Sequence, residues 1–325
     1  MIERIQGVHD EQEYLSRAEF EKQLRDTKKL ETEHGSVEYA IVEPETLISP
    51  RPVVYVGGFA HGRNSYVEEM FDLARSGRKI VYTNPIRGFD KGISENVAAL
   101  QQKYALPESV RAKVAALDAV IEAVRAGEDV DLVGHSQGGL LITLLGALRP
   151  AVVRHIVLQS PEGFQGKLST PRMMAKFARQ AVYQLRDVRE QNKQGDPRPA
   201  RVAARTAGSF TRELARDIFW RLTEEIPGSV RVAIAPVLKD IKTASKDAEK
   251  KTVISLLYAN SDRLFPPGVY EKGIEMERNL VEAAEPETGG VFDYVDCVAM
   301  YARKGAGHNA AANEKEGLLR KVLDQ

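Results

Sequence analysis

Short β-branched runs alternate with helix-like stretches along most of the chain after residue 36. Runs with the composition of strands lie at 36–43, 52–58, 79–83, 130–134, 155–160, 252–260 and 291–299. Apolar residues between two of these runs recur at spacings of four and three, namely Val110, Val114, Leu117, Ile121 and Val124. This spacing is typical of an amphipathic helix with one buried stripe. Because parallel strands need helical crossovers, the alternation predicts an α/β protein with a mostly parallel sheet and helices on both faces.

Two regions depart from this alternation. Residues 1–35 carry six basic and nine acidic side chains among few apolar ones, which predicts an N-terminal helical extension facing solvent. Residues 163–248 hold no strand-like run and are rich in arginine. They are expected to form a helical cap inserted into an α/β core made of residues 36–162 and 249–325.

Composition and charge narrow the function classes. Lys and Arg number 46 and Asp and Glu also 46, so the long-range attraction on which non-specific nucleic-acid binding depends is absent. The longest nearly apolar run, 138–148, is far shorter than the roughly 18 residues that a membrane span needs. The charged N-terminus is unlike a secretory signal, and the single cysteine, Cys297, cannot form an internal disulfide. We therefore expect a cytoplasmic protein with no membrane span and no nucleic-acid partner; a homodimer is left open.

The sharpest local motif is Gly134-His135-Ser136-Gln137-Gly138, a GxSxG sequence between a buried strand and a helix. A nucleophile on so tight a turn is held exposed with strained backbone angles, and the flanking glycines let neighbouring chain pass close to it. Taken alone, the same letters fit a plain glycine-rich turn. A nucleophilic Ser136 therefore depends on a base and an acid elsewhere in the chain.

A serine hydroxyl needs an imidazole to take its proton and a carboxylate to orient that imidazole. Among six histidines, His308 is the best candidate base because it lies in a glycine loop between the last predicted strand and the terminal helix. Asp262 follows the strand at 252–260, at the edge where catalytic groups of open α/β sheets collect. Glu162, just past the strand at 155–160, could reach the same edge and is a rival for the acid.

The oxyanion of an acyl-transfer intermediate needs backbone N–H donors. One is expected from Gln137, the residue after the nucleophile. The glycine-rich tract at 57–62 follows a predicted strand and is expected to supply the second, from Phe59. Gly58 and His61 of this tract are candidates to line the substrate pocket, although a loop histidine with no such role fits the sequence as well.

These features resemble the α/β-hydrolase superfamily, of the lidded serine esterase and lipase type, over residues 36–325. The resemblance rests on five motifs: GGFAHG at 57–62, RGFDKGIS at 87–94, GHSQG at 134–138, NSDRLFPP at 260–267 and GAGHN at 305–309. It implies an α/β-hydrolase fold with the triad Ser136, Asp262 and His308 and no cofactor or metal. The chain departs from the family pattern where Gly57-Gly58 replaces the common His-Gly and where the turn after 79–83 lacks the usual Arg-Gly-x-Gly form.

The cap is expected to select the substrate. Phe177 and Trp220 are candidates to roof an acyl pocket, although packing of cap helices against each other is an alternative for both. One cap helix with a buried face is predicted by apolar residues spaced by four, namely Phe210, Leu214, Ile218 and Leu222. Thirteen Lys or Arg against seven Asp or Glu in 167–225 favour either an anionic substrate or a solvated basic face.

The sequence thus favours a serine hydrolase that cleaves a small-molecule carboxylic ester through an acyl-enzyme. Thioesters, amides and certain carbon–carbon bonds are open to the same triad. A non-catalytic binding module that retains the pocket is the alternative from another class. A fluorophosphonate label separates the two, because it modifies Ser136 only in an active enzyme.

Overall fold

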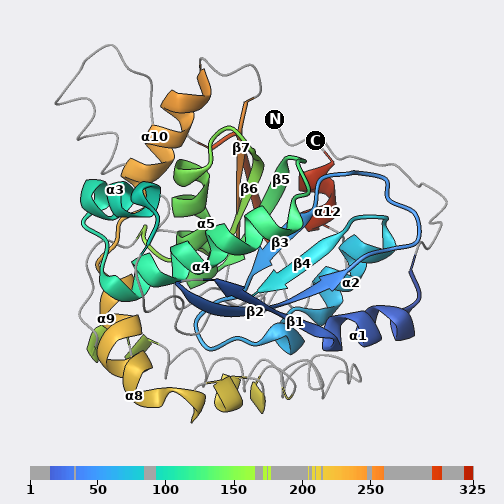
Figure 1. The fold of residues 1–325 in the computed structure, drawn as a ribbon, viewed down its shortest axis with the longest axis horizontal. Helices are drawn as coiled ribbons and strands as arrows, with labels where there is room; N and C mark the ends of the chain where they lie inside the picture. The colour runs from blue at the N-terminus through green and yellow to red at the C-terminus, as the bar shows by residue number, and fades with distance from the viewer. Residues whose placement is uncertain are drawn as a thin grey trace.

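A computed structural model describes residues 15–32, 34–83, 93–164, 171–173, 175–176, 204, 207–208, 210–213, 215–246, 251–259, 295–301 and 318–324. Its centre is an eight-stranded sheet in the order β1-β2-β4-β3-β5-β6-β7-β8 (Figure 1). The strands are β1 Thr27–Thr32, β2 Gly35–Val42, β3 Val53–Val56, β4 Ile80–Thr83, β5 Val130–His135, β6 Val153–Gln159, β7 Val253–Ala259 and β8 Cys297–Tyr301. Only the pairs β1–β2 and β2–β4 are antiparallel among these strands. The predicted mostly parallel sheet is confirmed.

Helices cover both faces of the sheet (Figure 1). One layer contains α3 Glu95–Tyr104, α4 Glu108–Val124, α5 Gln137–Leu148 and α10 Ala235–Lys246, and the other contains α1 Arg17–Arg25, α2 Val67–Arg75 and α12 Leu318–Leu323. Successive residues of a strand point to opposite faces, so Val54 and Val56 enter one core while Val53 and Tyr55 enter the other. Because helices cover both faces of these central strands, every residue of β3 to β6 is buried.

The N-terminal segment is only partly helical. Residues 17–25 form α1, whose Ser16 side chain caps the helix by accepting from the Glu19 N–H. Residues 27–32, expected to be helical, instead form β1, antiparallel to β2. The prediction was wrong there because the charged run pairs as an edge strand, whose exposed side chains need no apolar pattern.

The region expected to be a cap divides into two parts. Its last helix, α10, packs against α5, with Val237, Leu238 and Ile241 in the main core. Those residues therefore belong to the helical layer on the sheet. The earlier part contains α8 Ile218–Trp220, the π-helical turn η2 Arg221–Glu225 and α9 Ile226–Ser229, which lie beside the start of α4 (Figure 1).

The predicted buried stripe of the cap is wrong at two of its members. Ile218 is 41% exposed and Leu222 is 37% exposed, whereas Phe210 is half-buried and Leu214 lies outside the described residues. The helical path breaks at Asp217, and the turn that follows is π-helical. A wider turn no longer brings residues four apart onto one face, so the spacing loses its meaning.

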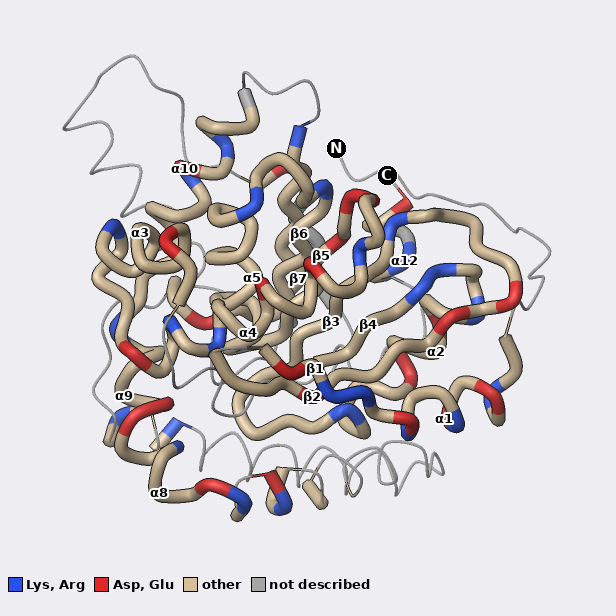
Figure 2. The backbone as a smooth tube through the Cα atoms, viewed as in Figure 1, with Lys and Arg blue, Asp and Glu red and all other residues tan. Residues whose placement is uncertain are grey.

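Charge is distributed without a dominant sign. Figure 2 shows basic and acidic positions interspersed along the described elements, in agreement with a formal charge of zero. No described helix combines the length and the apolar composition that a membrane crossing requires.

Candidate active site

Ser136 occupies the turn between β5 and α5. Its backbone has φ 55° and ψ −119°, a left-handed conformation that costs a non-glycine residue free energy. Three backbone hydrogen bonds hold it there: its N–H donates to Gln159 O at 2.9 Å, and its carbonyl accepts from the N–H groups of Gly139 and Glu162, each at 3.0 Å. The strained strand-to-helix turn is therefore built as its sequence predicted.

The glycines of the turn are required by close contacts between backbones. A Cβ atom on Gly138 would lie 2.2 Å from Val56 O, and one on Gly134 would lie 2.5 Å from Gly138 O. Both distances are far below a van der Waals contact, so β3 and the start of α5 can approach only where side chains are absent. This approach brings the end of β3, and the tract that follows it, beside Ser136.

The tract after β3 passes directly over the nucleophile turn. A Cβ atom on Gly58 would lie 3.1 Å from Ser136 Cβ, which places Gly58 in contact with the serine. The Gly58 N–H donates to Tyr66 Oη at 2.8 Å, so this donor already has an acceptor within the protein. The next residue, Phe59, is buried at 6% exposure. Gln137 is the first residue of α5, and the first N–H groups of a helix have no acceptor within it.

Tyr66 also fixes His135. Burial raises the pKa of Tyr66 far above its ordinary value, so its hydroxyl stays protonated. The Tyr66 oxygen accepts from Gly58 and lies 2.9 Å from His135 Nδ1, to which the hydroxyl proton can be donated. His135, at 1% exposure, is therefore a buried partner within the turn.

Aromatic rings gather over the same tract. The ring of His61 lies 5.8 Å from that of Tyr66, 5.9 Å from that of His135 and 5.7 Å from that of Phe210. Phe59 also meets Phe210, with their ring centroids 6.3 Å apart. Phe210 comes from the cap range, so a cap residue contacts two members of the predicted oxyanion tract.

A buried charged cluster stands behind Gln137, and sequence reasoning missed it. Lys113 Nζ donates to Gln137 Oε1 at 2.9 Å and forms an ion pair with Glu225. Arg221 Nη1 donates to the other Glu225 oxygen at 2.8 Å. Burial lowers the pKa of Lys113, an effect that Glu225 partly offsets. A signal was present, because Lys113 lies three residues after Val110 and four before Leu117, on the buried stripe of α4.

Glu162, the rival acid, lies against the nucleophile turn. Its N–H donates to Ser136 O, and its carboxylate accepts from Ser229 Oγ at 3.1 Å. Burial raises the pKa of Glu162 to about 7, and the Glu225 charge adds to the rise, whereas Ser229 and Lys113 oppose it. This carboxyl group therefore changes its charge near neutral pH.

Three predicted site residues, Asp262, His308 and Phe177, lie outside the described residues, so the triad and that part of the cap stay predictions. Trp220 is half-buried, and Lys113 Nζ lies 5.7 Å from its ring centroid. Within the described part of the chain, no three potential metal ligands gather into a site.

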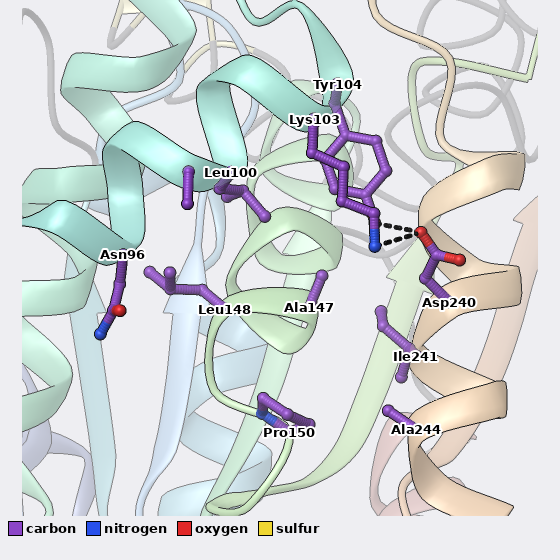
Figure 3. A pocket seen from close by; sticks show the side chains of 11 residues that line it. Asn96, Leu100, Lys103, Tyr104, Ala147, Leu148, Pro150, Asp240, Ile241 and Ala244 are labelled. Carbon is purple, nitrogen blue, oxygen red and sulfur yellow. Dashed lines mark hydrogen bonds and ion pairs between the residues drawn. The ribbon is translucent and has the colours of Figure 1, made fainter.

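A hollow of about 360 Å³ lies among α3, α5 and α10 (Figure 3). On one side, Lys103 Nζ and Tyr104 Oη reach the Asp240 carboxylate at 2.9 Å and 2.6 Å. Leu148, at the last position of α5, lines it. Leu148 lies eleven positions after Gln137 along α5, a rise of about 17 Å, so this hollow is remote from the nucleophile turn.

Comparison with known proteins bears on the same architecture. Residues 51–275, more than half of the chain, match the family model described as the alpha/beta hydrolase fold. No curated protein matches the chain in sequence. Among solved structures, a lipase-esterase related protein from Clostridium acetobutylicum is 14% identical (TM-score 0.55) and covers 89% of this chain and 98% of its own. A carboxylesterase from Bacillus subtilis is 13% identical (TM-score 0.54) and covers 94% of this chain and 95% of its own. The thioesterase domain from the curacin biosynthetic pathway is 16% identical (TM-score 0.53) and covers 92% of this chain and 99% of its own.

At such identities the structural likeness shows the fold alone, and it agrees with the sheet order and the nucleophile turn described above. The family model, the parallel sheet and the strained Ser136 turn lead to one conclusion: this chain belongs to the α/β-hydrolase superfamily.

Proposed function

We propose that the protein is a serine hydrolase that cleaves a carboxylic ester through an acyl-enzyme on Ser136. The observation that carries the proposal is the strained backbone of Ser136, held between the first residue of α5 and the tract containing Gly58. A non-glycine residue held in a strained backbone conformation on a strand-to-helix turn is expected where a reactive group must be presented. The hydrolase fold supports this chemistry without specifying the substrate.

In the proposed reaction, Ser136 Oγ attacks the ester carbonyl carbon while His308 takes the hydroxyl proton. Asp262 orients the imidazole and stabilises its charged form. The negative oxygen of the tetrahedral intermediate accepts from the N–H groups of Gln137 and Phe59. The alcohol then leaves with the proton from His308, and water hydrolyses the acyl-enzyme by the same steps.

We assign an apolar acyl group to the substrate. The support is the aromatic cluster of Phe59, His61 and Phe210, in which the His61 ring lies 5.9 Å from that of His135, the residue before Ser136. Phe210→Ala should lower kcat/KM for an octanoyl ester by about 10-fold or more while an acetyl ester changes little, because a buried apolar side chain contributes about 1.5–3 kcal/mol. Phe219→Ala is the matched control, since Phe219 belongs to the same segment and is 84% exposed. An unchanged octanoyl-to-acetyl ratio in Phe210→Ala contradicts this assignment.

A fluorophosphonate tests the nucleophile. The wild-type protein should gain one adduct per chain, on the peptide containing Ser136, and Ser136→Ala should gain none. Ser160→Ala is the control, because Ser160 is also buried, has φ 42° and directly follows the neighbouring strand β6; it should label normally. An unlabelled wild type would favour a binding module.

Thioesters are the second substrate class for this chemistry, and one similar fold is a thioesterase domain. Matched octanoyl ester and octanoyl thioester substrates decide between them. A higher kcat/KM for the thioester would keep Ser136 as nucleophile and change the substrate class.

A further inference from the structure

The two proposed oxyanion donors are connected by one buried chain of charged side chains. Gln137 is held by Lys113, Lys113 pairs with Glu225, and Glu225 accepts from Arg221. At the other end, the Arg221 guanidinium lies over the ring of Phe59, with Cζ 5.3 Å from the centroid. A single carboxylate, Glu225, therefore stands between the residue on α5 and the residue after β3.

Burial makes this connection rigid. The side chains of Lys113, Arg221 and Glu225 are 2%, 1% and 1% exposed. Charges so far from water are held in place by their partners, since losing a partner leaves an uncompensated buried charge. Buried ion pairs are also weak evidence for added stability, because desolvation offsets much of their attraction. Added stability therefore does not by itself explain why this charged cluster is buried here.

The local backbone shapes the cluster. Arg221 and Glu225 are the first and last residues of η2, a π-helical turn. Such turns are uncommon and often occur at functional sites. Here the turn directs Arg221 and Glu225 together, toward Lys113 of α4 on one side and Phe59 on the other.

We propose that Glu225, acting through Lys113 and Arg221, is a positioning residue that fixes the distance between the oxyanion donors of Gln137 and Phe59. The inference rests on the proposed function. The two donors come from segments 78 residues apart in sequence, and useful donors must lie within about 2.7–3.1 Å of the developing oxyanion. Contacts from a third segment, residues 221–225, restrain both donors at once. This turn is therefore part of the support of the oxyanion hole.

The test begins with Glu225→Gln, which keeps the size of the side chain and removes its charge. Because the oxyanion forms only after attack, a loosened donor pair lowers kcat and leaves KM nearly unchanged. We expect kcat for an octanoyl ester to fall about 10- to 100-fold, less than the loss of a whole donor, with KM within about twofold. The fluorophosphonate labelling rate should fall in parallel.

Arg78→Met is the matched control. Arg78 is also buried and paired with a buried carboxylate, Asp131, but at the opposite edge of the sheet. Its loss should lower the melting temperature while kcat of the folded protein stays within twofold of the wild type. A folded Glu225→Gln protein with unchanged kcat, or with a raised KM alone, overturns the inference.

A second measurement decides the matter if Glu225→Gln does not fold. Lys113→Met and Gln137→Met each remove one side of the same hydrogen bond, so their effects on kcat should not add in the double variant. Additive losses overturn the inference while the proposed function stands. A wild-type protein that neither hydrolyses esters nor labels at Ser136 contradicts the proposed function, and this inference with it.

Discussion

Two buried charged clusters stand at opposite ends of the same strand, β5. At its start, Asp131 is fully buried, with Arg78 Nη1 at 3.4 Å and Arg51 Nε at 3.6 Å from its Oδ2. At its end, Ser136 and Gln137 adjoin the cluster of Lys113, Glu225 and Arg221 described above. Both clusters enclose one carboxylate between two cations, yet they are built differently.

The cluster at the start of β5 has longer contacts and joins segments that are far apart in the chain. Asp131 Oδ1 and both ring nitrogens of His155 have no hydrogen-bond partner among the described residues. Arg78 reaches onward to the C-terminal helix, donating to Leu323 O at 2.9 Å and Asp324 Oδ1 at 2.6 Å. Its contacts join β5 to α12 and touch no predicted site residue.

The cluster at the end of β5 has shorter contacts and touches the nucleophile turn, although its Arg221 Nη2 also has no hydrogen-bond partner among the described residues. Lys113 donates to Gln137, the residue after Ser136. The comparison teaches that buried charge alone does not mark a functional site. What separates the two clusters is which residues they contact, and only one contacts Gln137 and Phe59, the proposed oxyanion donors.

Removing the nucleophile at the end of β5 should have the largest effect on kcat. Ser136→Ala should reduce kcat for ester hydrolysis by about 10⁴-fold or more, because the covalent step is lost. His308→Ala should cost a similar factor if His308 is the base. The measurement is steady-state hydrolysis by purified protein. Near-normal turnover in either variant would remove that residue from the mechanism.

The acid is next in expected size. Asp262→Asn should lower kcat by about 10³- to 10⁴-fold, because an amide favours the wrong imidazole tautomer. Glu162→Gln should cost less than about tenfold, since its carboxylate is bonded to Ser229. The reverse ranking would move the acid to the end of β6.

Glu162 should make stability fall as pH rises. Its pKa is raised in the folded state from 4.5 to about 7, so the folded state binds more protons than the unfolded state between those values. The stability gained by this group is complete below pH 4.5 and is lost as pH rises through 7, a change of roughly 3 kcal/mol. Urea unfolding of wild type and Glu162→Gln from pH 4.5 to 8 tests this, because the variant should lack that slope.

At the other edge of the sheet, His155 should have the opposite effect and make stability fall as pH is lowered. Burial, with Arg51 and Arg78, lowers its pKa from 6.5 to about 4. The unfolded state then binds more protons between pH 4 and 6.5, so this group's stability is present above 6.5 and is lost on acidification toward 4. We expect a change of roughly 2–3 kcal/mol, absent in His155→Gln. An equal acid sensitivity in that variant would assign the loss to other groups.

A partly exposed ion pair, which belongs to neither cluster, extends the comparison to the surface of the protein. Arg17 donates to both carboxylate oxygens of Glu68, at 2.8 Å and 2.9 Å, and joins α1 to α2. Both side chains are about one-third exposed. Arg17→Met should lower the free energy of unfolding by less than about 1 kcal/mol, less at high salt. A loss as large as that of Arg78→Met would contradict the importance given to burial.

The sequence by itself determined the elements that depend on local pattern. The strands from β2 to β7, the helix α4 and the strained turn at Ser136 follow from β-branched runs, a period near 3.6 and the GxSxG spacing. These features are readable because each arises from neighbours in the chain. The pairing of Asp262 and His308 with Ser136 remains a prediction of the same kind.

Only the tertiary structure decided which charged residues meet. Lys113 and Glu225 are 112 residues apart, and no periodicity in either segment indicates the other. The same holds for the pairing of β1 with β2, for the packing of α10 on α5 and for the exposure of Ile218 and Leu222. Long-range contacts depend on how buried surfaces fit and how buried charges find partners, and these are properties of the assembled fold.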